Sequence, residues 1–117
     1  MIDEKAFELG RLLGQTDEYK ALKRASEGLK DDPDTQKQLA DVERLATELD
    51  RAARAGREPE AAEVERYETS LQSVQGSPVY QSVVAAQANF EKLMAKVNAR
   101  IYEGIQKGAA SPIITLS

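Results

Sequence analysis

Apolar and polar side chains alternate along most of this 117-residue chain at intervals of three and four residues. This spacing keeps the apolar side chains on one face of an α-helix, because a helix has about 3.6 residues per turn. Prolines and capping residues before these segments, and glycines after them, mark where the helices begin and end. The pattern predicts five helices, at roughly residues 2–14, 17–30, 33–55, 59–75 and 78–107.

The last of these segments carries the longest apolar stripe in the chain, which runs from Val79 to Ile105. At a rise of 1.5 Å per residue, its roughly 30 residues form a rod of about 45 Å. A compact globule of this length has a radius of gyration of about 13 Å, which corresponds to a diameter of roughly 35 Å. A compact single copy of the chain is therefore too small to cover the whole stripe.

We expect a second copy to cover the remainder, since apolar surface left in water forgoes about 25 cal/mol per Å². The predicted fold is all-α, with about five helices and a long C-terminal helix in an extended helical bundle that forms a homodimer or a higher oligomer. The predicted oligomer interface consists of Val83, Ala86, Phe90, Leu93, Val97 and Ile101. An elongated helical hairpin that covers its own stripe is the alternative.

The length of the chain predicts a single helical domain, residues 1–108, followed by a non-helical C-terminal tail, residues 109–117. Gly108, Ser111 and Pro112 interrupt the helical pattern there. We expect the apolar residues of the tail to pack against a helix face or a neighbouring subunit.

Composition and charge exclude several classes of protein. The net charge of −4 argues against direct binding to nucleic acid, which requires clusters of basic residues. The chain has neither cysteine nor histidine, which excludes thiol nucleophiles, disulfides, zinc fingers and imidazole catalysis. Its acidic N-terminus and the lack of a run of about 18 apolar residues predict a cytoplasmic protein without membrane insertion.

Two acidic clusters contain the carboxylates that a divalent metal prefers. They are Asp31, Asp32 and Asp34 before the third predicted helix, and Glu60, Glu63, Glu65 and Glu68 near the start of the fourth. The first cluster lacks the ligand spacing of an EF-hand, and the second lacks the histidines of a di-metal bundle. We interpret them as helix caps and a solvated face, and expect no metal, cofactor or catalytic residue. A carboxylate-based metal or ligand-binding bundle is the alternative.

Polar residues also accompany the stripe of the last predicted helix. Its basic residues are Lys92, Lys96, Arg100 and Lys107. They would suit an acidic partner, but Glu91 and Glu103 alternate with them, so we interpret them as a solvated face. Asn98 either fixes the register of an interface or is exposed.

The order of these features resembles the YlbF/YmcA/YheA family of small bacterial helical proteins. The resemblance begins with "FELGRLLGQTDEYKALKRA", residues 7–25, and continues with the acidic corner at Asp31 to Asp34. A long helix then closes at Gly56, and "GSPVYQSVVAAQANFEKLMAKVNARIYEGI", residues 76–105, follows.

The resemblance implies an all-α helical dimer with no catalytic residues. It further implies a regulator of competence, biofilm formation or sporulation, in a multiprotein complex that modulates RNA processing by a membrane-associated endoribonuclease. Some relatives hold iron–sulfur clusters through cysteines, which this chain lacks, so it is more similar to the YheA-like branch. We therefore predict a non-enzymatic adaptor with a second copy and other regulatory proteins as partners; a purely structural oligomer is another alternative.

Overall fold

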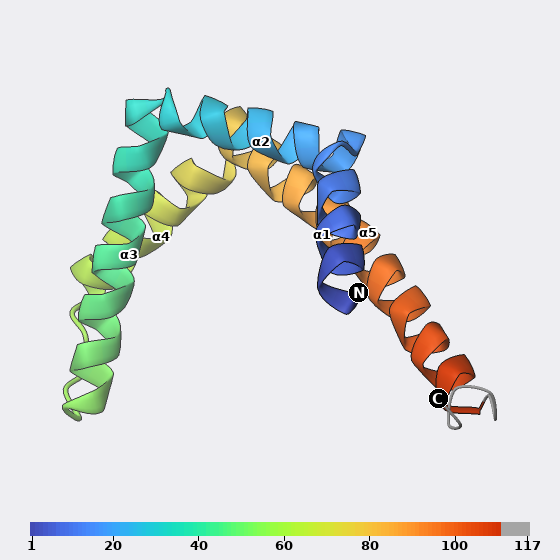
Figure 1. Ribbon diagram of the computed structural model, residues 1–117. Helices are drawn as coiled ribbons and strands as arrows, with labels where there is room; N and C mark the ends of the chain where they lie inside the picture. The colour runs from blue at the N-terminus through green and yellow to red at the C-terminus, as the bar shows by residue number, and fades with distance from the viewer. Residues whose placement is uncertain (111–117) are drawn as a thin grey trace.

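The computed structural model describes residues 1–110 of the chain, and all of the regular structure in that range is helical. The five helices are α1 (Ile2–Gly14), α2 (Asp17–Lys30), α3 (Pro33–Arg54), α4 (Ala61–Gln75) and α5 (Pro78–Ala110). Together they form an open arch (Figure 1). One arm consists of α3 and α4, and α5 extends from the top of the arch into the other arm. The predicted all-α fold with a long C-terminal helix is confirmed.

Three helix ends differ from the prediction. Helix α3 ends one residue earlier, and α4 begins at Ala61, because Glu60 is still extended with ψ at 145°. Helix α5 continues through Ala110, so the first two residues of the predicted non-helical tail are helical. A glycine costs a helix only about 1 kcal/mol relative to alanine, and two alanines follow Gly108. The remainder of the predicted tail lies outside the described residues.

The far end of the α3–α4 arm is closed by a glycine turn. Gly56 has a φ of +71°, a conformation that residues with a side chain rarely adopt. Its backbone N–H donates to the carbonyl of Ala53 at 3.1 Å, and the N–H of Arg57 donates to the carbonyl of Ala52 at 2.9 Å. These two bonds form a Schellman motif, which satisfies the last carbonyls of α3 and turns the chain toward α4.

Two helix pairs form the core. Helix α3 packs on α4, and α2 packs on the first half of α5. The buried apolar side chains are Leu45, Ala52, Val74, Val83 and Ala86. Such a small core is what remains when five helices spread into an arch instead of enclosing one another.

A polar contact joins the two helix pairs at the top of the arch. The hydroxyl groups of Thr35 and Ser77 lie 3.0 Å apart, and Thr35 is buried. Both residues also take part in helix caps. Asp32 accepts from the backbone N–H of Thr35 at 3.2 Å, and Ser77 accepts from that of Tyr80 at 3.4 Å. The starts of α3 and α5 are thereby held together.

The arch leaves much of its surface uncovered. Its radius of gyration is 21.8 Å, with principal extents of 68 × 37 × 19 Å, whereas a compact chain of this length has a radius of about 13 Å. The accessible surface is 9252 Å² for a mass of 12.9 kDa. A compact monomer of that mass exposes about 6,300 Å², so the arch exposes roughly 3,000 Å² more.

Candidate functional site

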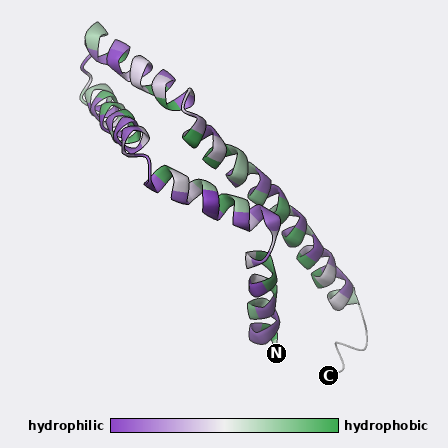
Figure 2. Cartoon of the chain, turned by 90° about the horizontal axis from the view of Figure 1, so that it is seen from above, coloured by the Kyte–Doolittle hydropathy of each residue, from purple (hydrophilic) through white to green (hydrophobic). Residues whose placement is uncertain are grey.

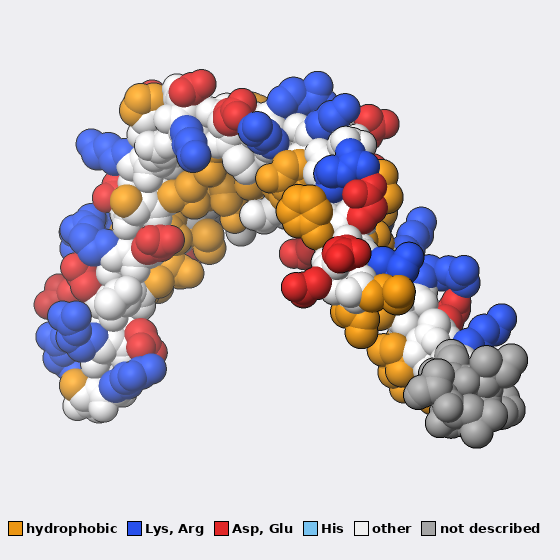
Figure 3. Space-filling model, viewed as in Figure 1, with side chains coloured by type: hydrophobic (Ala, Val, Ile, Leu, Met, Phe, Trp, Pro, Cys, Tyr) orange, Lys and Arg blue, Asp and Glu red, His pale blue; other side chains and the backbone are white. Residues whose placement is uncertain are grey.

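Large apolar side chains that remain exposed gather at one end of the arch. We call this surface the apolar end, and it consists of Ile2, Phe7, Leu12, Tyr19, Ile101, Tyr102 and Ile105. Within the part of the chain that the structure describes, α3 and α4 contribute no large exposed apolar side chain. Figure 3 shows apolar side chains along the arm formed by α1 and α5, next to charged side chains of both signs.

Helix α1 contributes apolar side chains that nothing in the same copy buries. It has no buried residue, and Phe7 is 75% exposed. A capped turn sets its direction: the Thr16 hydroxyl donates to the Leu13 carbonyl at 2.7 Å and accepts from the Tyr19 N–H at 3.2 Å. The helix therefore turns away from α5 (Figure 2), and both sides of α1 are left with apolar residues in solvent.

Helix α5 contributes the end of a stripe that begins in the core. With 33 residues, α5 is about 50 Å long, whereas the 14 residues of α2 cover only about 21 Å of it. The cover ends near Phe90, whose ring meets that of Tyr19 edge-to-face with centroids 5.7 Å apart. Beyond that point the same face continues to Ile101 and Ile105, which are 47% and 60% exposed.

The six residues of the predicted oligomer interface differ in how far a single copy buries them. Val83 and Ala86 are buried within a single copy, so they have little surface left for a second one. Of the other four residues, Phe90, Leu93 and Val97 are half-buried, and Ile101 is exposed. The stripe is continuous, and the part of it that α2 covers is the part that is buried within one copy.

Sequence reasoning missed part of the apolar end. Phe7, Leu12 and Tyr102 lie beside the stripes of their helices, not on them. A stripe at helical spacing indicates the face that packs within the chain. It does not identify apolar residues beside it, such as these three, as part of an exposed surface. The available signal was the presence of large apolar residues on more than one side of α1.

Charges of opposite sign flank the apolar end. The first turn of α1 carries Asp3 and Glu4, and the basic residues along the second half of α5 are Lys92, Lys96, Arg100 and Lys107. Arg100 pairs with Glu103, while among residues 1–110 Asp3, Glu4, Lys92, Lys96 and Lys107 are in no ion pair. The α1 side thus offers free carboxylates, and the α5 side offers free ammonium groups.

A local ion pair accounts for the charges at the other end of α1. Arg11 bonds with Glu8 one turn earlier on the helix, through its Nε at 3.1 Å. The hydrogen bond that the guanidinium donates to the Glu8 carboxylate raises the pKa of Arg11 above its ordinary value. Both side chains are exposed, so this pair adds little to stability.

The acidic clusters form no metal site in the described part of the chain. Asp32 caps α3, as interpreted from the sequence, and Asp34 lies in the first turn of the same helix. Within residues 1–110, no group of three or more acidic residues is close enough to hold a metal ion.

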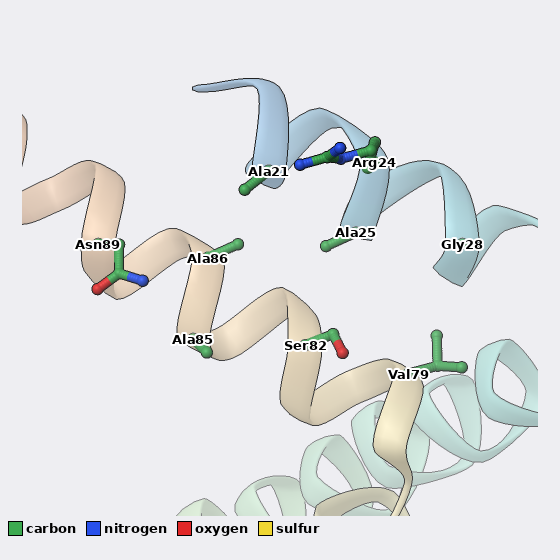
Figure 4. A pocket seen from close by; sticks show the side chains of 9 residues that line it. All are labelled: Ala21, Arg24, Ala25, Gly28, Val79, Ser82, Ala85, Ala86 and Asn89. Carbon is green, nitrogen blue, oxygen red and sulfur yellow. The ribbon is translucent and has the colours of Figure 1, made fainter. Parts of the chain in front are cut away.

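A shallow groove of about 550 Å³ lies between α2 and α5 (Figure 4). It is lined by Ala21, Arg24, Ala25, Gly28, Val79, Ser82, Ala85, Ala86 and Asn89. Arg24 is its one titratable side chain, so the groove has no acid–base pair. In Figure 4, Ala25 and Ala86 point toward the facing helix, and their small size lets α2 and α5 approach closely. The groove is a feature of helix packing.

These features define an extended all-α protein whose exposed surface suits helix–helix contact. The structure contains no helix within residues 1–110 that is long and apolar enough to span a membrane. The chain belongs to the family described as "Control of competence regulator ComK, YlbF/YmcA", whose model matches residues 2–106. This finding confirms the resemblance seen in the sequence and places the chain in a family of regulators.

Two relatives match this chain over most of its length. The chain is 27% identical over 105 residues to a "UPF0342 protein" of Limosilactobacillus reuteri (strain DSM 20016). The match covers 90% of this chain and 85% of that relative. A "UPF0342 protein" of Limosilactobacillus reuteri subsp. reuteri (strain JCM 1112) matches with the same identity and coverage.

Proposed function

We propose that this chain is a non-enzymatic helical adaptor of the cytoplasm that binds other proteins through its apolar end. Through these contacts it takes part in the control of competence, biofilm formation or sporulation by way of RNA processing. The family supports the regulatory setting. The observation that carries the proposal is the gathering of exposed apolar side chains on α1, the start of α2 and the second half of α5.

The physical argument rests on what an exposed apolar patch costs. Fully burying an Ile or Phe side chain contributes about 1.5–3 kcal/mol. Contiguous exposed patches larger than a few hundred Å² usually mark interaction sites. Because none of the large apolar side chains of α3 and α4 is among the exposed ones, the apolar end is the surface from which an adaptor of this shape gains most by binding.

The proposal is tested by genetic complementation in the bacterium that encodes the chain. The gene is deleted and replaced by wild type, by Ile101→Glu/Ile105→Glu, or by the control Val84→Glu. Val84 is a matched control, because it is an exposed apolar residue of α5 outside the apolar end. Transcripts of competence genes and the half-lives of processed RNAs are measured in each strain.

We expect the double variant to behave like the deletion and Val84→Glu to behave like wild type. Two charged side chains would have to be desolvated in any complex formed by the double variant. If deletion leaves competence transcripts and RNA half-lives unchanged, the regulatory role is wrong. If the double variant complements fully, the apolar end is not the surface that carries it.

A further inference from the structure

We propose that the arch is a hinge: the α3–α4 pair and the α2–α5 pair each move as one body and rotate about the two short linkers between them. The linkers are residues 31–32 and 76–77, at the top of the arch (Figure 1). The contact between the hydroxyl groups of Thr35 and Ser77, which we call the latch, holds the shape that the structure describes. This inference concerns how the molecule changes shape and does not rest on the proposed function.

The packing divides these four helices into two bodies. Helix α3 packs along α4, and α2 packs along the first half of α5, whereas the two pairs make few contacts with each other. The rings of Tyr19 and Phe90 meet within one pair. The ion pairs found among residues 1–110 all join side chains one turn apart on a single helix. No ion pair or ring pair in that range therefore fixes one body against the other.

The two linkers are built in the same way. In each, the first residue ends a helix, the second caps the next helix, and a proline follows. The side chains of Asp32 and Ser77 each accept from the backbone N–H three positions later, at 3.2 Å and 3.4 Å. Both linkers lead from one pair to the other, and the latch places them side by side. The two pairs can therefore rotate about a line through both linkers without coming apart.

The prolines confine the bend to the linkers. Pro33 and Pro78 are the first residues of α3 and α5. A proline cannot donate a hydrogen bond to the carbonyl four positions earlier, so the preceding helix cannot continue through it. It also disfavours helical backbone at the residue before it. Consecutive helices thus stay separate whatever the angle between the two pairs.

The side-chain hydrogen bonds that join the two pairs differ in burial. Besides the latch, the amide of Gln36 donates to the Leu29 carbonyl at 2.9 Å, and that of Gln81 donates to the Gln75 carbonyl at 2.8 Å. Both glutamines are exposed, so water replaces these two bonds at little net cost. Thr35 is buried, so a rotation that breaks the latch costs more. The latch is therefore the polar contact that favours the described shape over others.

Gly76 leaves other shapes open to the second linker. Its φ of −83° and ψ of −8° are accessible to any residue with a side chain. A Cβ at this position would lie 3.4 Å from the nearest atom, the carbonyl oxygen of Gln72, which is an ordinary contact. The described shape does not require a glycine here. A glycine also adopts positive φ readily, which gives this linker conformations that another residue would lose.

Rotation about the linkers changes the distance between the apolar end and the glycine turn at Gly56. A partner that contacts both arms binds one angle better than the others and shifts the population toward it. Through the hinge, binding at one arm thereby sets the position of the other arm.

Pulsed electron spin resonance on the full chain measures this rotation, because the chain has no natural cysteine for a spin label to modify. Ala53→Cys/Ala99→Cys places one label on each arm. The control pair, Ala40→Cys/Ala62→Cys, places both labels on the α3–α4 arm. All four alanines are exposed. Labelled chains are diluted into an excess of unlabelled wild type, so that only distances within one copy are measured.

We expect the distance distribution between the arms to be at least twofold wider than that of the control pair. Thr35→Val removes the latch and should widen the distribution between the arms by a further half or more. Gly76→Ala fits the described backbone and should narrow it, because positive φ is lost. The control distribution should be the same in all three backgrounds.

Two results would overturn the inference. A distribution between the arms that is as narrow as the control and unchanged in Thr35→Val would show that the top of the arch is a rigid corner. A control distribution as wide as that between the arms would show that the α3–α4 pair does not move as one body. Because Gly76→Ala keeps the described backbone, it tests the hinge even if Thr35→Val fails to fold, and an unchanged width in Gly76→Ala would contradict rotation at the second linker.

Discussion

Thr35 is the buried polar residue that joins the two helix pairs of the arch. Its hydroxyl lies 3.0 Å from that of Ser77, across 42 positions of the sequence. Thr35→Val keeps the shape of the side chain but leaves the Ser77 hydroxyl without this partner. We expect the free energy of unfolding, measured by urea denaturation, to fall by about 1–2 kcal/mol.

The control for this prediction is Thr47→Val on the same helix. The Thr47 hydroxyl bonds only to the carbonyl of Glu43 one turn earlier and is exposed. Its replacement should change stability by less than about 0.5 kcal/mol. An equal loss in the two variants would show that the contact at the top of the arch contributes nothing beyond the local cost of valine in a helix.

Capping residues were predictable at the residue scale, because a cap acts within one turn of the chain. Thr16 and Asp32 accept hydrogen bonds from backbone N–H groups three positions later, as their place before a helix predicts. The contact between Thr35 and Ser77 was not predictable, because it joins residues that only the tertiary arrangement brings together. Exposure of Phe7 and Tyr102 depends on the same arrangement.

The apolar stripe of α5 has two parts with different roles. Val83 belongs to the part that α2 buries, and Ile101 to the part that remains open. Val83→Ala should lower the free energy of unfolding of the monomer by about 2 kcal/mol, because two buried methyl groups are lost. Ile101→Ala should change it by less than about 0.5 kcal/mol.

Urea denaturation at protein concentrations low enough to keep the chain monomeric distinguishes these outcomes. The same two variants should reverse their order in a dilution series, where Ile101→Ala weakens association more than Val83→Ala does. A large loss of monomer stability in Ile101→Ala would show that a single copy already covers the end of α5.

At the scale of elements, the number and type of the helices were predictable, but their pairing was not. Periodicity and caps depend on neighbouring residues, which the sequence displays directly. Which part of the α5 stripe is covered depends on the length and position of α2, and the stripe itself is uniform from Val83 to Ile101. The interface predicted from the stripe therefore included residues that one copy already buries.

The whole molecule is an arch because its five helices pack in pairs and not around one common centre. The α3–α4 pair forms one arm, and the α2–α5 pair supports the other. In a compact globule of this length, α5 would extend beyond the rest of the chain. The arch is more open than such a globule, and the second half of α5 lacks cover within one copy in it as well.

We propose that the apolar end is a protein-binding surface whose first partner is a second copy. Light scattering at micromolar concentration measures this most directly, with wild type, Ile101→Glu/Ile105→Glu and Val84→Glu compared. We predict twice the 12.9 kDa mass of one copy for wild type and Val84→Glu, and the mass of one copy for the double variant. A wild-type chain that stays monomeric, or a double variant that stays dimeric, would contradict the account.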